Sequence, residues 1–223
     1  PLLMEQEQRY TLTAAWIGLR GFAAPQVAAN ATTILQLARK QGRSQSLLVG
    51  FIGIYTATNT QGRIAEALEW AQRALAEGEN TRNVDLHIWG HQAATTSHFF
   101  LGHLREAREH ANQALALYDP RRAEHWIRLN PLEIKTTIGI WSSAWTWMLG
   151  YPDQAVQISE EKDAYARKLR YPFNLCHALT MGAEVFHYLC EPERLLERVS
   201  EADRLARDQG LPFYTDVMVP VGE

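Results

Sequence analysis

Apolar residues recur along this chain at the spacing of an amphipathic helix. From residue 64 to 79 the apolar positions follow an i, i+3, i+6 and i+7 pattern, and residues 103–118 repeat it. One face of an α-helix has this period, because each turn takes about 3.6 residues. No run of β-branched residues alternates with a period of two, so the sequence predicts helices and no strands.

Glycines and prolines mark where these helices end and begin. A helix commonly ends at a residue in the left-handed conformation, which glycine adopts without steric cost. Pro25, Pro152 and Pro192 each suit the first turn of a following helix, where a missing N–H is tolerated. The predicted outgoing helices are roughly 3–20, 44–61, 84–101, 132–149 and 173–189, and the returning ones are roughly 24–41, 63–79, 103–118, 152–169 and 192–209.

The turns inside these predicted hairpins recur at a fixed interval. The hinge positions Phe22, Gly62, Gly102, Gly150 and Cys190 are 40 residues apart, except for one interval of 48. Such self-similarity is typical of stacked helix pairs. We therefore predict an all-α fold, an α-solenoid of about five antiparallel helix pairs in one repeat domain spanning 1–223. The repeats are approximately 3–42, 43–82, 83–130, 131–170 and 171–210, and 211–223 begins a further repeat or forms a tail.

Small residues recur on the returning helices, five and twelve positions after the hinge. Ala67 and Ala74 are repeated by Ala107 and Ala114, and alanine at these positions lets neighbouring helices approach closely. In the later repeats, larger residues replace alanine at two of these positions: Lys162 twelve residues after Gly150, and Leu195 five residues after Cys190. The sequence therefore predicts looser packing in those repeats.

The long interval contains an insertion at 118–131, bounded by Pro120 and Pro131. Insertions in repeat arrays lie in loops on one face and often contribute to function. Lengthening a surface loop also costs little free energy, so a functionless loop is the alternative. Trp126 is the candidate contact residue in this segment.

Composition and charge exclude several classes of partner. The net charge is −3 and the two signs are interspersed, so no basic stripe favours nucleic acid or an anionic membrane. The longest apolar stretch, 47–55, is too short to span a bilayer. Cys176 and Cys190 are 14 residues apart near one predicted helix, roughly 20 Å, which is too far for a disulfide. Free thiols and the lack of a signal peptide predict a cytoplasmic protein.

The sequence predicts no catalytic, metal or other cofactor site. Five histidines, His87, His91, His98, His103 and His110, fall within 24 residues. His87 and His91 share a helical face, but His98 is two turns further along the chain, too far to share one ion. We interpret these histidines as structural. Cys176 and His177 are adjacent and point about 100° apart on a helix, so they cannot form a nucleophile–base pair. We therefore expect this chain not to be an enzyme.

The hinge glycines and the small residues after them resemble a tetratricopeptide repeat with a longer period. The stretches 91–119 and 145–173, above all 149–155 (LGYPDQA), are similar to the C-terminal repeat regions of large bacterial signalling proteins. In those, an adenylate or guanylate cyclase or a DNA-binding domain precedes the repeats, together with an AAA- or STAND-type ATPase of the LuxR/MalT kind. This chain matches neither the cyclase nor the phosphate loop of the ATPase. The resemblance implies a non-catalytic regulatory segment of such a protein.

The same resemblance implies which residues line a concave groove, because outgoing helices line the groove of tetratricopeptide solenoids. An aromatic side chain there would anchor a partner segment, although an aromatic stripe at helical spacing usually belongs to the core. The candidate groove residues are Trp89, Gln92, Thr96, Phe99, Thr137, Ile140, Trp147, His177, Glu184 and His187.

Two functions remain open at this point. The first is a protein-interaction module that binds a partner segment, or a neighbouring domain of the same chain, in this groove. The alternative is a small-molecule sensor in which Trp126 and the insertion close over a ligand and control an attached ATPase or cyclase. The apolar ends, 1–3 and 217–221, carry no polar cap, so we expect further repeats or burial of an end in a homodimer.

Overall fold

The described part of the chain is helical throughout. A computed structural model describes residues 8–9, 12–13, 16, 22–42, 44–130 and 132–218, and it contains no strand within these ranges. Most of the predicted helix 3–20, the apolar end 1–3 and residues 219–221 of the other end lie outside them, although 8–9, 12–13 and 16 are helical. The chain divides into two compact units, 1–118 and 119–223, which are considered separately. A single repeat domain over 1–223 stays a prediction.

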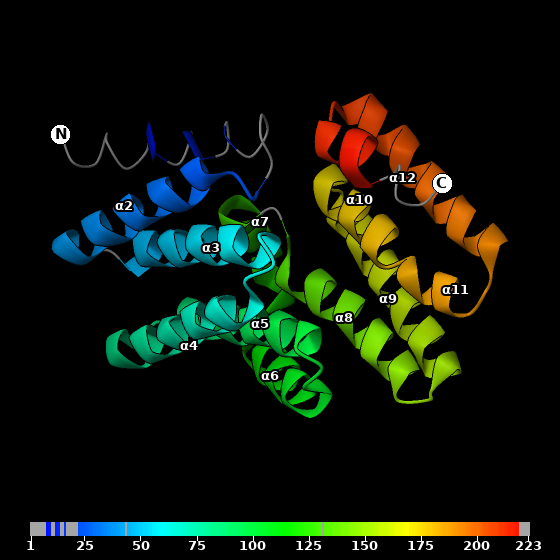
Figure 1. Cartoon of the computed structure of the whole chain (residues 1–223), viewed down its shortest axis with the longest axis horizontal. Helices are drawn as coiled ribbons and strands as arrows, with labels where there is room; N and C mark the ends of the chain where they lie inside the picture. Colours follow the sequence, from blue (N-terminus) through cyan, green and yellow to red (C-terminus); the bar gives the residue numbers. More distant parts are fainter. Residues whose placement is uncertain are drawn as a thin grey trace. The chain divides into compact units, whose positions relative to one another are not determined.

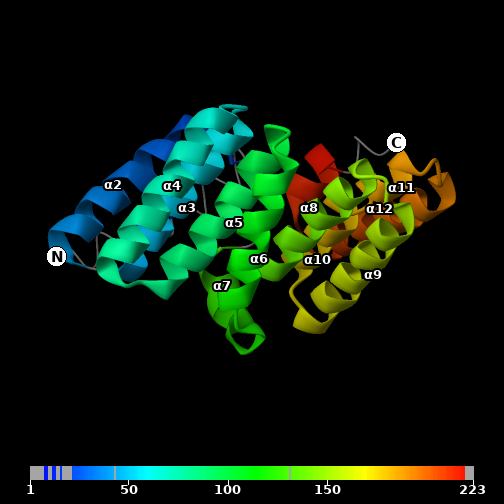
Figure 2. The same cartoon turned by 90° about the horizontal axis from the view of Figure 1, so that it is seen from below.

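The first unit is a series of helices in which each packs against the next along the chain. In Figure 1 and Figure 2 they run as successive antiparallel rods, coloured from blue to green. Helix α3 (Ser44–Thr60) also contacts α5 (Val84–Phe100), so one hairpin stacks on another. The helices are α2 (Pro25–Gln41), α3 (Ser44–Thr60), α4 (Ile64–Thr81), α5 (Val84–Phe100) and α6 (Leu104–Leu117).

The second unit begins with two short helices and continues with longer ones. Contacts join α8 to α9, α8 to α10 and α10 to α12, so hairpins stack here as well. Its elements are the 3-10 helix η1 (Pro120–Arg122), α7 (Ala123–Leu129), α8 (Ile134–Met148), α9 (Pro152–Leu169), α10 (Pro172–Met181), α11 (Glu184–Tyr188), α12 (Pro192–Gln209) and the π-helical turn η2 (Tyr214–Met218).

A buried polar network fixes α8 to α10. Glu133 is fully buried, and its carboxylate accepts hydrogen bonds from the backbone N–H groups of Lys135 and Thr136 at 3.1 and 2.9 Å. Asn174 of α10 accepts from the Glu133 N–H at 3.1 Å and donates to the Thr136 hydroxyl at 3.0 Å. The Glu133 carboxylate caps α8, while the Glu133 backbone N–H and the Thr136 hydroxyl form hydrogen bonds with Asn174 of α10, so the start of one outgoing helix is registered against the next.

Four of the five hinges, all but Phe22, have the left-handed backbone conformation. Gly62, Gly102 and Gly150 have φ of 76, 78 and 89°, and Cys190 at the equivalent position has φ of 57°. This conformation crowds the Cβ of any residue other than glycine. The shared geometry confirms that the 40-residue interval marks equivalent turns.

Replacing Cys190 with glycine is expected to stabilise the protein by about 1 kcal/mol, because the steric cost of the left-handed conformation disappears. Cys190 is exposed, so little packing is lost. The measurement is the free energy of unfolding in urea. Val84→Gly, a substitution at an exposed helical residue, is the control and should be destabilising. A destabilised Cys190→Gly would contradict the interpretation.

The small residues on the returning helices pack as predicted. Ala67, Ala74, Ala107 and Ala114 are all fully buried. Their methyl groups allow close approach of the helices because a larger side chain would hold the backbones apart.

The expectation of looser packing at Lys162 is wrong. Its side chain is 1% exposed and fills the space left by two glycines. A Cβ on Gly139 would lie 3.0 Å from Lys162 Cγ, and a Cβ on Gly182 would lie 1.4 Å from Lys162 Nζ. The lysine is accommodated because the facing helices carry no side chain at these points.

Two predicted boundaries also need correction. The segment 118–131 forms η1 and α7 instead of a plain loop, and Asp119 begins η1 by accepting a hydrogen bond from the Arg121 N–H at 3.0 Å. The predicted helix 173–189 is interrupted at Gly182 and Ala183. The Lys162 ammonium occupies the space beside Gly182 and donates to the Ala178 carbonyl at 2.8 Å, at the end of α10.

The all-α fold and the antiparallel helix pairs are thus confirmed. None of the helices in the described ranges is both long enough and apolar enough to cross a lipid bilayer.

Candidate functional site

Exposed apolar side chains gather at one end of the second unit, where α8 turns into α9 beside α11. Met148, Leu149 and Tyr151 are 46, 49 and 55% exposed. Next to them the half-buried rings of Trp147 and Tyr188 stack at 4.7 Å. We call these five residues the tip surface. Single exposed apolar residues are ordinary, whereas several that lie close together along the chain are candidates for a contact surface.

Local structure explains why the tip surface is apolar and fixed. Gly150 reverses the chain with φ of 89°, and Pro152 starts α9, so the residues around the turn have few neighbours to cover them. The tip surface is supported from below, because Trp147 packs against the buried cluster of Ala155, Val185 and Phe186. An aromatic ring held in this way has little side-chain freedom left to lose on contact with another molecule.

Tyr188 combines a ring with a polar group. Burial and a hydrogen bond to the Glu184 carboxylate raise the pKa of Tyr188. Its hydroxyl is therefore neutral and donates to Glu184, one helical turn earlier. An uncharged aromatic pair at this position suits an apolar partner segment.

The candidate groove residues on α5 are mostly buried. Trp89 is 1% exposed and packs edge-on against Tyr55 with ring centroids 5.5 Å apart, so it belongs to the core. Gln92 and Thr96 are also buried and hydrogen-bonded to each other at 3.2 Å. Phe99 alone among these four is partly accessible. The reason is that α5 packs against helices on several sides.

The candidates in the second unit divide in the same way. Thr137, Ile140 and His177 are buried, while Glu184 is partly accessible and His187 is exposed. Of the predicted residues, Trp147 belongs to the tip surface, where its ring stacks on Tyr188, and Glu184 adjoins it by accepting the Tyr188 hydrogen bond. Sequence reasoning missed Met148, Leu149 and Tyr151 as site residues. Their signal was present, since apolar side chains on both sides of a hinge glycine have nothing local to cover them.

Trp126, the candidate contact of the insertion, is fully buried in the second unit. Its indole N–H is buried and has no hydrogen-bond acceptor among the described residues. A buried donor without an acceptor costs free energy, so it needs a structural or functional reason.

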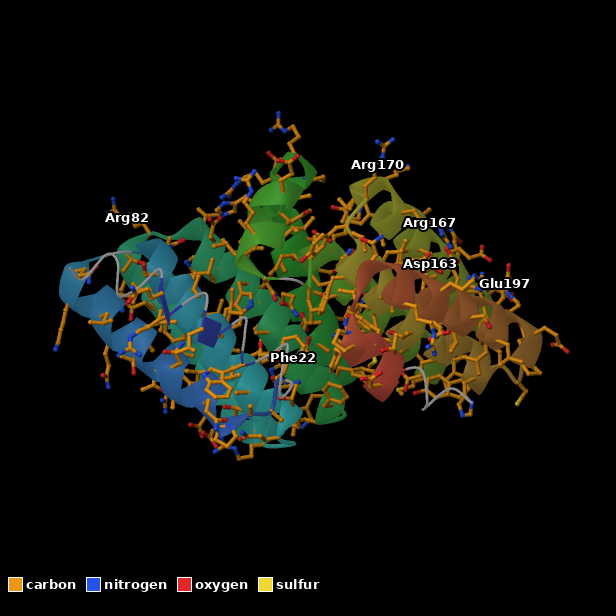
Figure 3. The ribbon with its side chains drawn as sticks, turned by 90° about the horizontal axis from the view of Figure 1, so that it is seen from above. Phe22, Arg82, Asp163, Arg167, Arg170 and Glu197 are labelled. Carbon is orange, nitrogen blue, oxygen red and sulfur yellow. The ribbon has the colours of Figure 1, made fainter. Side chains whose placement is uncertain are left out.

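A charged cleft of about 380 Å³ lies between α9 and α12, where Asp163, Arg167 and Glu197 are labelled in Figure 3. Ion pairs span it at successive turns. Arg194 meets Glu160 at 2.7 Å, Arg198 meets Asp163 at 3.0 Å, and Arg167 pairs with Glu201. Because these groups are engaged with each other, the cleft is an ionic seam between repeats.

The thiol beside His177 is not poised for catalysis. Burial raises the pKa of Cys176 to about 11, so it is a neutral thiol near pH 7. Burial lowers the pKa of His177 to about 3, and the nearby Lys162 acts in the same direction. His177 is therefore neutral, with its Nδ1 buried and unpartnered among the described residues.

The histidines that cluster in the sequence, His87, His91, His98, His103 and His110, come together across the Gly102 hinge. His110 of α6 lies between His91 and His98, with its Nδ1 2.8 Å from that of His91. Within the described ranges, no three His, Cys, Asp or Glu side chains are arranged to hold a metal ion. Pairing the antiparallel helices across the Gly102 hinge would have placed His110 near His91 from the sequence alone.

The fold is that of a helical-repeat protein, an all-α solenoid. Eight solved chains match the structure. One is TTC0263, a thermophilic TPR protein of Thermus thermophilus, with 15% sequence identity and a TM-score of 0.57 over 97% of this chain and 95% of that one. At this identity the likeness shows the fold alone, an α-solenoid. No model of a known protein family matches the chain, and no curated protein matches it.

Proposed function

We propose that this chain is a non-catalytic protein-interaction module that binds an apolar partner segment at its tip surface. The observation that carries the proposal is the stacked pair of Trp147 and Tyr188, supported by the core and flanked by exposed Met148, Leu149 and Tyr151. Anchored aromatic residues dominate the energy of many protein interfaces. Helical-repeat folds present such residues on a rigid frame.

This proposal shifts the predicted contact from a groove along the outgoing helices to the hinge end of the second unit. Phe99, Trp147, Glu184 and His187 remain accessible to a partner, and the buried candidates act by holding the helices in place. The sequence resemblance supports a regulatory role within a larger bacterial signalling protein. Any cyclase or ATPase activity would belong to other domains of that protein. Association of two copies through the terminal repeats stays a prediction.

Site-specific photocrosslinking tests the proposal. A photoreactive phenylalanine at Tyr151, in cells of the source organism, is expected to capture one defined protein. The matched control is the same group at Glu161, which is exposed on the polar surface of α9. Equal capture at both positions, or capture of no protein at Tyr151, would contradict the proposal.

Leu149→Asp is expected to weaken binding of the captured partner by about 30-fold, the effect of losing roughly 2 kcal/mol at an interface hot spot. The unfolding free energy should change by less than about 0.5 kcal/mol, because the side chain is exposed. Calorimetry with the purified partner measures the first quantity and urea denaturation the second. Arg105→Asp, at an exposed position of α6 in the first unit, serves as the control. Unchanged affinity of Leu149→Asp would remove the tip surface from the interface.

The Trp126 indole N–H, which has no acceptor within the described ranges, favours a second candidate function, a small-molecule sensor. A polar group of the ligand would accept this hydrogen bond when the insertion 118–131 opens. A thermal-shift screen of cellular metabolites tests it. The sensor requires a compound that stabilises the wild-type chain and has no effect on Trp126→Phe.

A further inference from the structure

Five imidazoles form a continuous row along the seam between α5 and α6. The order along the row is His87, His91, His110, His98 and His103. His87 and His91 stack at 6.5 Å, His91 and His110 are joined through Nδ1 atoms 2.8 Å apart, and His98 stacks on His110 at 5.3 Å. His98 and His103 face each other through Nδ1 atoms 3.4 Å apart. The chain has 8 histidines, so most of its imidazoles lie in this one seam.

The geometry of the row depends on its protonation state. One N–H between His91 and His110 donates to a lone pair on the other ring, which requires at least one neutral imidazole. The pair accepts one proton without losing this bond. A second proton leaves two N–H groups facing each other 2.8 Å apart. The bond is then replaced by repulsion between two cations.

Proton uptake by the row is opposed by its surroundings. Burial, followed by the charges of His110 and His87, lowers the pKa of His91 to about 4. Burial and neighbouring imidazoles likewise lower the pKa values of His98 and His110, and the carboxylates of Glu106 and Glu109 act in the opposite direction with less weight.

Helix α4, which packs on another side of α5, faces His87 with Gly78. Four charged side chains of α4, those of Glu66, Glu69, Arg73 and Glu77, form ion pairs with each other or with residues outside the helix. The pairs are Arg63–Glu66 at 2.8 Å, Glu69–Arg73 at 3.3 Å and Arg39–Glu77 at 3.5 Å. The carboxylates that act on His98 and His110 are those of Glu106 and Glu109, and both belong to α6.

Few apolar contacts hold α6 in place. Its buried residues are Ala107, Ala111 and Ala114, each of which buries a single methyl group. Leu115 and Leu117 are 38 and 47% exposed. The hydrophobic contribution to the seam is small, since it scales with the apolar area removed from water. The imidazole row is thus a major part of what joins α6 to α5.

We infer that the α5–α6 seam is a proton-operated release, in which acidification below about pH 5 frees α6 from α5 while α2, α3 and α4 remain folded. The direction of the pH effect follows from linkage. The pKa of His91 in the folded chain lies below the ordinary histidine value of about 6.5. The seam is therefore most stable above about pH 6.5, and this stability is lost as the pH falls toward about 4.

Amide hydrogen exchange of the whole chain at pH 7.5 and pH 5.0, in buffers containing EDTA, tests this inference. After correction for intrinsic rates, protection of residues 104–117 is expected to fall at least about tenfold more than that of residues 44–60. The double variant His91→Gln/His110→Gln should lose this extra response. His125→Gln, in the second unit, should keep it. An acid response equal in α3 and α6, or one preserved in the double variant, would overturn the inference.

A direct titration keeps the test decisive if the double variant does not fold at pH 7.5. NMR of the wild-type imidazoles is expected to place His91 well below 6. Titration of His91 and His110 near 6.5 would overturn the inference without any variant. The pair His98→Gln/His103→Gln, at the exposed end of the row, provides a second comparison by hydrogen exchange.

Discussion

Replacing Lys162 with alanine is expected to lower the free energy of unfolding of the second unit by about 3 kcal/mol. The Lys162 ammonium lies 2.9 Å from Asp163 Oδ1 and donates to the Ala178 carbonyl oxygen at 2.8 Å. Alanine removes both interactions and opens a cavity beside Gly139 and Gly182, where the lysine stem now packs. Cavity formation and a buried acceptor that loses a donor both destabilise the folded state.

Lys162→Met separates the effect of the cavity from the effect of losing the charged donor. Burial lowers the pKa of Lys162, so taking the ammonium out of water is itself unfavourable. Methionine fills much of the same volume without that cost, and Asp163 retains Arg198 at 3.0 Å. We therefore expect Lys162→Met to lie within about 1 kcal/mol of wild type.

Urea denaturation followed by circular dichroism and tryptophan fluorescence measures both effects. Lys168→Ala, at an exposed position of the same helix, is the control and should change stability by less than about 0.5 kcal/mol. If Lys162→Ala also proved this mild, the buried lysine would not be a structural element of the fold.

Local signals explain why so much of the fold was predictable. Hinge glycines and first-turn prolines fix helix ends through the backbone alone, so α9 and α12 begin and end where the pattern predicted. Lys162 shows what such signals omit. A lysine in an alanine position suggests loose packing unless the two glycines that face it from other helices are known.

The candidate site was less predictable, because exposure depends on neighbours that lie far away in the sequence. Trp89 fits the groove register of a tetratricopeptide repeat, but Tyr55 of the preceding hairpin covers its ring. The histidine row posed a similar problem, since spacing along α5 does not include His110 of α6. The tip surface was accessible to sequence reasoning, because Leu149 and Tyr151 flank a hinge that leaves them uncovered.

The second large effect is expected at Trp126. Trp126→Ala should lower the free energy of unfolding by about 4 kcal/mol, because a fully buried indole is replaced by a cavity. The loss arises because Trp126 and Ala123 are the buried residues of the short helix α7. Without the indole, little apolar area would hold α7 in place. Ile127→Ala, at the next and only partly buried position, is the matched control and should cost less. Urea denaturation measures both.

Trp126→Phe distinguishes a packing role from a binding role. The phenyl ring keeps most of the buried area and removes an N–H that has no acceptor among the described residues. Losing an unsatisfied donor offsets part of the lost ring contact, so we expect a change of less than about 1.5 kcal/mol in unfolding free energy. A larger loss would mean that the N–H has a partner in solution, such as a buried water or a ligand. Unchanged stability together with unchanged partner binding would assign Trp126 to the core and leave the tip surface as the site of contact.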